Sequence, residues 1–297
     1  MSFLSWNCRG LGNPCTVQEL AHLVRAKDPS AVFLCETWSN DEHLEQLRCR
    51  LHFNNKLLVP SNKKGGGLAL FWNKSFDLFV LSYSHNHIDT VIYSGTSDAW
   101  RLTFIYGAPE THMRIETWNL IRRLSRQIHF PWCCIGDFNE IALSTEMQGR
   151  RPRPERQMKE FRAVLDDCGM LDLGYRGSPF TWCNNREPPN TIWVRLDRGV
   201  ATLDWIHKFH GARLEHLNVT NSDHKCLHLE LEPCNQPTIY GNHSVLKRYG
   251  LVMLVVKLLF RPNGINAEMA QQCFKFGTNS KIAKGVLANG VSSTLVM

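Results

Sequence analysis

A carboxylate and a carboxamide lie two residues apart in the run GDFN at 136–139, directly after a short apolar segment. That segment, Trp132 to Ile135, follows Pro131 and ends at a glycine, which is typical of a buried strand that stops abruptly. Polar side chains at such a strand end face a cleft, and Asp137 and Asn139 are of the types that metal-assisted phosphoester chemistry uses. For an isolated run, an ordinary turn capped by these two side chains is the competing interpretation. The rest of the chain has to decide between the two.

Further side chains of the same chemical types stand beside other predicted strands. They are Asn7 after the first strand, Glu36 after the strand at 31–35, Tyr106 closing the strand at 102–105, Asp197 within RLDR at 195–198, and Asp223 and His224 before the last strand. Each one alone has an ordinary explanation, such as a turn former, a packed aromatic ring or a surface ion pair. Independent accidents rarely deliver such a set in order, so we expect these residues to converge at one edge of the sheets.

Alternating strand and helix signals fill the first 232 residues and must position these side chains. We expect helices at 14–27, 41–51, 113–127 and 157–168, and strands at 3–6, 31–34, 68–72, 76–83, 88–93, 100–106, 132–135, 191–200, 213–219 and 225–231. The four successive strands from 68 to 106 favour antiparallel pairing. Many strands are apolar on both faces, so two sheets packed face to face with helices outside fit better than one wide sheet. The glycines at 65–67 indicate a bend before a strand rather than a phosphate-binding loop.

Composition indicates a globular, intracellular protein. With 297 residues, 43% of them hydrophobic, the chain can bury one large core or two smaller ones. Its eleven cysteines are irregularly spaced and none forms a CxxC pair, which favours reduced thiols in a reducing compartment over disulfides or a zinc site. The N-terminus lacks a basic segment followed by a long apolar stretch, so we expect no signal peptide.

The formal charge of +7 is concentrated in the last part of the chain. Residues 233–297 hold seven of the 34 Lys and Arg but one of the 27 acids, so they carry +6 and residues 1–232 carry +1. We therefore expect a domain at 1–232 and a basic, weakly structured tail at 233–297, whose apolar run at 251–260 is too short to span a membrane. The basic run Arg150, Arg151 and Arg153 is the best local candidate for phosphate contacts, with a solvated loop as the alternative.

Taken in order, the motifs resemble the endonuclease/exonuclease/phosphatase superfamily, and specifically the endonuclease domain of plant LINE-type non-LTR retrotransposons. The matching segments are LSWNCRGLGNP at 4–14, FLCETW at 33–38, GGLALFW at 66–72, IYGAPE at 105–110, PWCCIGDFNEI at 131–141, RRPRPERQM at 150–158, SPFTWCN at 178–184, RLDRGVA at 195–201 and SDH at 222–224. The resemblance covers residues 1–232 and is specific as an ordered set, although no single motif is. Two departures are Lys225, where the family has a Cys-Pro-Leu-like continuation, and a tail without a reverse-transcriptase signature.

The resemblance implies an α/β (α+β) fold of four layers, in which two face-to-face mixed β-sheets are flanked by helices. It also implies hydrolysis of phosphodiesters that depends on Mg²⁺, with Mn²⁺ as its substitute. By motif, Glu36 would be the principal metal carboxylate, Asn7 would assist at the metal and phosphate, and Asp223 would complete the shell. These hard ligands suit an ion that keeps several waters for substrate exchange.

The remaining roles are likewise carried over from the family. Asp137 would orient or deprotonate the attacking water, and Asn139 would hold a non-bridging phosphate oxygen. His224 would donate a hydrogen bond to the phosphate, with Asp197 fixing its tautomer and orientation. Tyr106 would stabilise the developing charge. Together they describe an in-line displacement at phosphorus.

The implied partner is a DNA duplex, with no membrane and no obligate protein partner, and a nuclear place of action follows from the resemblance alone. Two alternatives stay open. One is another phosphoesterase of the superfamily that acts on RNA, abasic DNA, a phosphoinositide or a small phosphate ester, because fold alone does not set the substrate. The other is a nucleic-acid-binding remnant without catalysis, which the basic tail favours.

Overall fold

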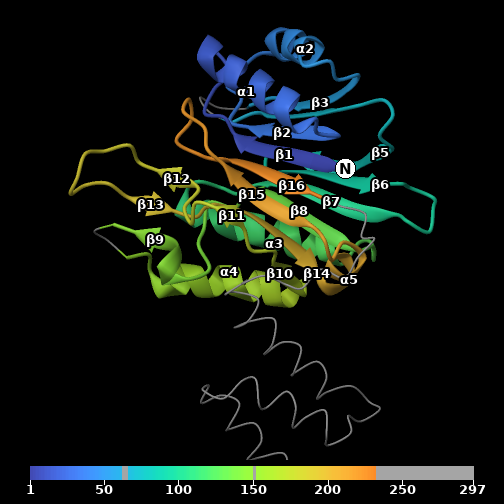
Figure 1. Ribbon diagram of the computed structural model, residues 1–297. Helices are drawn as coiled ribbons and strands as arrows, with labels where there is room; N and C mark the ends of the chain where they lie inside the picture. The colour runs from blue at the N-terminus through green and yellow to red at the C-terminus, as the bar shows by residue number, and fades with distance from the viewer. Residues whose placement is uncertain (62–65, 150–151, 232–297) are drawn as a thin grey trace, which may run out of the picture. The chain divides into compact units, whose positions relative to one another are not determined.

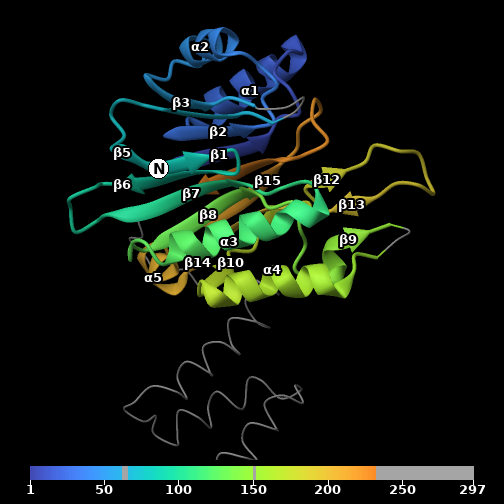
Figure 2. The same cartoon turned by 180° about the vertical axis from the view of Figure 1, so that it is seen from behind.

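The computed structural model describes residues 1–61, 66–149 and 152–231. Two large β-sheets lie face to face, and helices cover the outer face of each sheet (Figure 1). Helices α1 (Pro14–Lys27) and α2 (Asp41–Arg50) form one outer layer, and α3 (Arg114–Ser125) and α4 (Glu155–Asp167) form the other. Figure 2 shows α3 and α4 side by side over the second sheet. The four-layer fold expected from the motifs is therefore confirmed.

The first sheet has seven strands in the order β11-β15-β16-β1-β2-β4-β3. Its centre is β1 (Ser2–Asn7), which pairs in parallel with β2 (Ala31–Cys35) and antiparallel with β16 (Cys226–Glu230). The other strands are β3 (Asn55–Val59), β4 (Leu68–Trp72), β11 (Arg176–Gly177) and β15 (Arg213–Leu217).

The second sheet has six strands in the order β10-β14-β8-β7-β6-β5. Strands β7 (Trp100–Tyr106) and β8 (Trp132–Asp137) are parallel, and β14 (Asp197–Thr202) runs antiparallel to β8. The remaining strands are β5 (Leu78–Ser84), β6 (His87–Ile92) and β10 (Met170–Asp172). A small third sheet contains β9 (Met147–Gln148), β12 (Trp182–Cys183) and β13 (Trp193–Val194), and the short helices are α5 (Leu203–Lys208) and two 3₁₀ turns, Thr111–Met113 and Ser144–Glu146.

Strand alternation divides the buried side chains among the layers. Successive side chains of a strand point to opposite faces, so Phe3 packs between the sheets while Leu4 packs against the helices over the first sheet. Between the sheets, Phe33 of β2 and Phe104 of β7 stack with ring centroids 5.1 Å apart. Strands apolar on both faces are therefore explained by burial on both sides, as the sequence led us to expect.

Several expected elements are confirmed in detail, and two expectations need correction. Asn13 Oδ1 accepts a hydrogen bond from the Cys15 N–H (3.0 Å), so Asn13-Pro14 begins α1 as predicted. The single strand expected at 191–200 is wrong, because the chain leaves β13 after Val194 and enters another sheet at Asp197. The run from 68 to 106 is also divided: β4 pairs with β2 and β3, whereas β5, β6 and β7 pair with one another in the second sheet.

The break between β13 and β14 has a clear physical reason. The backbone N–H groups of Leu196 and Asp197 both donate to Thr181 Oγ1, at 2.9 and 3.0 Å, instead of joining a strand ladder. At the same point Arg195 turns its side chain into the interior, where it is fully buried. The chain therefore changes sheets at the point where Arg195 reaches its buried carboxylate partners, Glu146 and Asp172.

Two arginines and two carboxylates form a buried ion cluster beneath this break. Arg195 contacts Glu146 and Asp172 at 2.9 and 2.8 Å, and Arg198 contacts the same two residues at 2.8 and 3.0 Å. One interpretation of the sequence was that Asp197 forms a surface ion-pair cluster with the two arginines that flank it. This interpretation is wrong, because both arginines are buried and pair with Glu146 and Asp172 instead. The cluster ties β14 to β10 and to the turn at Ser144–Glu146.

The residues predicted as a tail at 233–297, together with Arg150 and Arg151, lie outside the described residues. Nine cysteines fall within the described part, and all nine are free thiols. Within that part, no helix is both long and apolar enough to cross a membrane.

Replacing Arg198 by alanine should strongly destabilise the domain, because it leaves Glu146 and Asp172 short of a buried partner. We expect the free energy of unfolding, measured with urea, to fall by about 3–5 kcal/mol. The matched control is Arg156→Ala, since Arg156 is 89% exposed and pairs with Glu160 on the helix surface; its effect should stay below about 0.5 kcal/mol. Equal effects in the two variants would contradict a stabilising role for the buried cluster.

Acid should weaken the domain through the same cluster. Burial acts to raise the pKa of Asp172, but Arg195 and Arg198 outweigh it and lower the pKa to about 2. An unfolded aspartate has a pKa of about 3.9. The contribution of Asp172 is thus fully present above pH 4 and is lost as the pH falls towards 2. Urea unfolding at several pH values measures the free energy of unfolding across this window. That free energy should fall less steeply with decreasing pH for Asp172→Asn than for the wild type. An equally steep fall in the two proteins would refute the contribution of Asp172.

Candidate active site

Strand register brings the predicted residues into two rows. In the second sheet Asp137 of β8 is the middle residue of one row. Tyr106 of β7 pairs with it on one side, and Asp197 of β14 pairs with it on the other. In the first sheet Asn7 pairs with Cys35, which places it beside Glu36 at the end of β2. Both rows lie at the same edge of the sandwich, because hydrogen bonds join them directly.

Asn7 is the link between the two rows. Its Nδ2 donates to Glu36 Oε1 at 2.8 Å and to Asp137 Oδ2 at 3.0 Å, and the side chain is buried. The Tyr106 hydroxyl donates to the same Glu36 oxygen at 3.1 Å. Burial, followed by the nearby charge of Glu36, holds the pKa of Tyr106 well above its usual range, so the phenol remains a neutral donor.

Asp137 and Asn139 form a tight turn and also face the site. The Asn139 N–H donates to Asp137 Oδ1 at 2.8 Å, and Asn139 Nδ2 donates to Gly107 O at 2.8 Å and to Asp137 Oδ2 at 3.2 Å. A side chain at Gly136 would place its Cβ 2.0 Å from Ile105 O, so the close approach of β7 and β8 requires glycine directly before the aspartate. GDFN therefore forms a turn at the end of a buried strand, and the functional role of its side chains stays a prediction.

His224 lies between two carboxylates. Its Nδ1 is 2.9 Å from Asp197 Oδ2 and 3.9 Å from Asp137 Oδ2, and the Trp6 indole N–H donates to its carbonyl at 3.1 Å. Burial acts to lower the pKa of His224, but Asp197 and then Asp137 outweigh it and raise the pKa to about 9. Burial and the nearby Asp197 charge raise the pKa of Asp137. The site thus holds more negative charge than its own cations balance.

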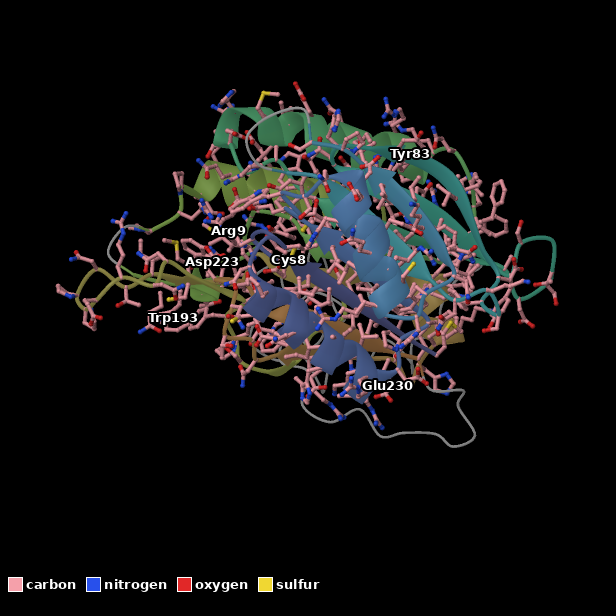
Figure 3. The ribbon with its side chains drawn as sticks, turned by 90° about the horizontal axis from the view of Figure 1, so that it is seen from above. Cys8, Arg9, Tyr83, Trp193, Asp223 and Glu230 are labelled. Atoms are coloured by element: carbon pink, nitrogen blue, oxygen red, sulfur yellow. The ribbon has the colours of Figure 1, made fainter. Side chains whose placement is uncertain are left out.

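Arg9 was not singled out in the sequence, yet it connects two predicted metal ligands. Its Nε lies 3.3 Å from Asp223 Oδ1, and its Nη1 lies 3.6 Å from Glu36 Oε2. Asp223 Oδ2 accepts a hydrogen bond from the Trp182 indole at 2.9 Å. Figure 3 shows Arg9 and Asp223 next to each other, with Cys8, the residue that follows β1, close to them. The signal that could have found Arg9 is its place in WNCRG, two residues after Asn7.

A cavity of about 330 Å³ opens at this edge. Its lining mixes polar side chains, among them Glu36 and His224, with apolar ones such as Trp182. The cavity is lined by Arg9, Glu36, Pro109, Arg114, Asn139, Met147, Arg153, Trp182, Ile192, Val194, Leu196 and His224. A chain with alternating charged and apolar groups would fit such a lining.

Of the predicted basic run, Arg153 reaches this cavity. Its Nε lies 3.0 Å from Glu140 Oε1, and Arg114 Nη1 lies 2.5 Å from the other oxygen of the same carboxylate. Two guanidinium groups therefore share one carboxylate, which leaves positive charge at the cavity wall. Arg150 and Arg151 lie outside the described residues.

The donors at the site fit a hard divalent cation. Four carboxylates, Glu36, Asp137, Asp197 and Asp223, face the two cationic groups Arg9 and His224. Among the described residues, Asp223 Oδ1 is a buried oxygen that accepts no hydrogen bond, and the Arg9 guanidinium 3.3 Å away is its ion-pair partner. One atom each of Asp137, Asp197 and His224 also lie within 4.8 Å of one another. Mg²⁺ prefers oxygen ligands and excess negative charge, and the carboxylates of Glu36 and Asp223 offer both. The cluster of Asp137, Asp197 and His224 is the poorer metal site, because a protonated imidazole cannot bind a cation.

Known structures share this fold. The endonuclease domain of TRAS1, a telomere-specific non-LTR retrotransposon, is 15% identical, with a TM-score of 0.56 over 79% of this chain and 99% of that domain. An AP endonuclease from Archaeoglobus fulgidus is 12% identical, with a TM-score of 0.60 over 78% of this chain and 99% of its own. The AP endonuclease LMAP from Leishmania major is 16% identical, with a TM-score of 0.60 over 78% and 88%. At these identities the likeness concerns the fold alone.

Comparison with curated proteins found no match. The sequence itself matches the model of the Endonuclease/Exonuclease/phosphatase family over residues 4–254, which is most of its length. The chain therefore belongs to the endonuclease/exonuclease/phosphatase family.

Proposed function

We propose that the chain is a Mg²⁺-dependent endonuclease that nicks DNA, of the kind that non-LTR retrotransposons carry. The observation that carries the proposal is the single hydrogen-bonded network in which Asn7 joins Glu36 to Asp137 beside the His224–Asp197 pair. The likeness in fold to a retrotransposon endonuclease domain and to AP endonucleases supports DNA as the substrate. Action on chromosomal DNA would place the protein in the nucleus.

Glu36, Asn7 and Asp223 would hold the metal ion. The guanidinium of Arg9 lies between the two carboxylates, which supports a common volume where positive charge is stabilised. When bound, Mg²⁺, or Mn²⁺ in its place, supplies a Lewis acid for a phosphate oxygen. These three residues come from the ends of β1 and β2 and from the loop before β16, so one sheet edge presents all of them.

His224 is suited to donate to the phosphate. Its Nδ1 is taken by Asp197, and its Nε2 lies 3.4 Å from Asn7 Nδ2. Both hydrogens of that amide are already donated, to Glu36 and Asp137, so Nε2 is left for a ligand in the cavity. The Asp197 carboxylate fixes which ring nitrogen faces the substrate.

Asp137 would accept a proton from an attacking water. Three N–H groups, from Asn7 and Asn139, hold its two oxygens in one orientation. The amide hydrogens of Asn139 are donated to Gly107 and Asp137, so binding a phosphate oxygen requires Asn139 to exchange one of these bonds. Tyr106, a neutral donor to Glu36, completes the set of groups that meet developing negative charge.

Because all of these groups come from one chain, we expect no obligate protein partner. The cavity wall supports a nucleic-acid ligand as well. Arg9, Arg114 and Arg153 offer positive charge to a phosphate backbone, while Trp182 offers an apolar face to a sugar or base.

Mutating the acids should abolish nicking. In a supercoiled-plasmid assay with Mg²⁺, Asp137→Ala and Glu36→Gln should each reduce the nicking rate at least about 10²-fold, the lower range for loss of a general base. The matched control is Asp98→Asn, because Asp98 is 77% exposed and pairs with Lys208 far from these residues in sequence; it should nick at the wild-type rate. A wild-type protein that is folded yet as inert as the two variants would refute the proposal.

The same assay separates the alternatives. Competition by RNA, by duplex with an abasic site and by a soluble phosphate ester tests which phosphodiester is preferred. An abasic duplex that is cut much faster than intact plasmid would replace DNA nicking by a repair-type activity. DNA binding that survives Asp137→Ala, without any metal-dependent turnover in the wild type, would identify a binding remnant.

Asp197 should act through His224 and not by itself. Asp197→Asn removes the charge that holds the imidazole, so we expect the nicking rate to fall about 10²- to 10⁴-fold. His224→Gln should cost as much, and the double variant should be no slower than the slower single variant, because both changes disable one unit. Rate losses that multiply in the double variant would show that the two residues act independently.

A further inference from the structure

Trp38 is an exposed aromatic side chain beside the candidate active site, and the proposed mechanism gives it no role. It follows Glu36 by two residues and is 48% exposed. Single exposed apolar residues are common on protein surfaces, so exposure alone has no meaning. The neighbours of the ring are what distinguish this tryptophan.

The backbone holds the Trp38 ring in a defined place. Trp38 has a φ of +46°, which is unusual for a bulky residue, and its N–H donates to Gly66 O at 3.3 Å. On the other side, the Gly10 N–H donates to Glu36 O at 2.8 Å. A Cβ on Gly10 would lie 2.7 Å from Trp38 Cε3, so the glycine makes room for the ring to lie against the backbone. The loop thus presents a fixed aromatic surface, which costs little entropy to use.

A cation connects this surface to the active site. The guanidinium carbon of Arg9 lies 5.5 Å from the centroid of the Trp38 ring, within cation–π range. The same guanidinium contacts Glu36 and Asp223 and lines the cavity. Aromatic ring, positive charge and catalytic carboxylates are therefore contiguous.

The exposed aromatic side chain of Tyr83 lacks this setting. Tyr83 on β5 is 58% exposed, and Figure 3 places it on the opposite side of the molecule from Arg9 and Asp223. It therefore serves as a control for exposure without proximity to the site.

We infer that Trp38 stacks against a nucleobase of the DNA strand next to the cleaved phosphodiester, while Arg9 binds the adjacent phosphate. An aromatic face beside a basic group is the arrangement by which proteins hold unpaired nucleotides, and every base has a face for it. A base can reach Trp38 only after leaving its own stack, so the enzyme should prefer DNA in which that base is unpaired or easily opened. This inference rests on the proposed function and adds the form of DNA that the site accepts.

Binding in EDTA tests the stacking without cleavage. The full chain is titrated into a duplex with a one-nucleotide bulge of 2-aminopurine and into the matched paired duplex, with anisotropy and 2-aminopurine fluorescence as readouts. We expect tighter binding and fluorescence quenching on the bulged DNA. Trp38→Ala should weaken that binding by about 5- to 150-fold, the range for loss of one stacked base, with a smaller change on the paired duplex. Trp38→Phe should retain most of the affinity, and Tyr83→Ala should bind as the wild type does.

Equal affinities of the wild type and Trp38→Ala for the bulged duplex would overturn the inference, as would equal losses on both duplexes. Thermal unfolding of each variant checks that the fold is kept, and Trp38→Phe provides the test if Trp38→Ala is unstable. The plasmid assay keeps the two ideas apart. If the wild type nicks plasmid but binding does not depend on Trp38, the stacking inference alone is refuted. If the protein does not nick but binds bulged DNA through Trp38, the stacking surface is supported and the proposed enzymatic activity is refuted.

Discussion

The amide of Asn7 donates to carboxylates from both halves of the sandwich, and the arrangement of the site depends on this bond pair. Glu36 belongs to the first sheet and Asp137 to the second, so their separation is set by how the two sheets pack. Between the sheets that separation is maintained by a close-packed apolar layer that includes the stacked rings of Phe33 and Phe104. A change in the thickness of this layer would move the two carboxylates relative to each other. Core packing and site geometry are therefore one constraint.

Excess negative charge is the second property that follows from this packing. Four acidic side chains lie at the site. Their negative charge is balanced only in part by two cations, the partly exposed Arg9 and the buried His224. The raised pKa of His224 reflects that imbalance. Directly behind Asp197, by contrast, Arg195 and Arg198 match Glu146 and Asp172 one to one. The balanced cluster supports β14, and the unbalanced one faces the cavity, where we propose that a divalent cation would complete it.

The sequence allowed the fold to be predicted, and also the convergence of these polar side chains at one edge, because both depend on local signals. Apolar runs located most strands, and motif order identified which strand ends carry the polar groups. The break at Arg195 could not be foreseen, because it depends on Thr181 and on acids far away in the chain. Arg9 was missed for a similar reason. Its partners Asp223 and Trp38 are brought to it by sheet order and by a loop contact, so its place in WNCRG marks the residue but does not reveal these partners.

Four of the eight non-glycine residues with a positive φ in the described part of the chain lie at or beside the candidate site. Arg9, Glu36, Trp38 and Asn139 all have a positive φ, although none is glycine. Such conformations cost of order 1–3 kcal/mol each when they are unfavoured, and surrounding contacts have to hold them. Here backbone bonds between Gly10 and Glu36 and between Trp38 and Gly66 do so, and Asp137 holds Asn139. Because these bonds form within the chain itself, the strained residues are in place before any ligand arrives. The energy that orders the site comes from folding, so binding energy is left for the substrate.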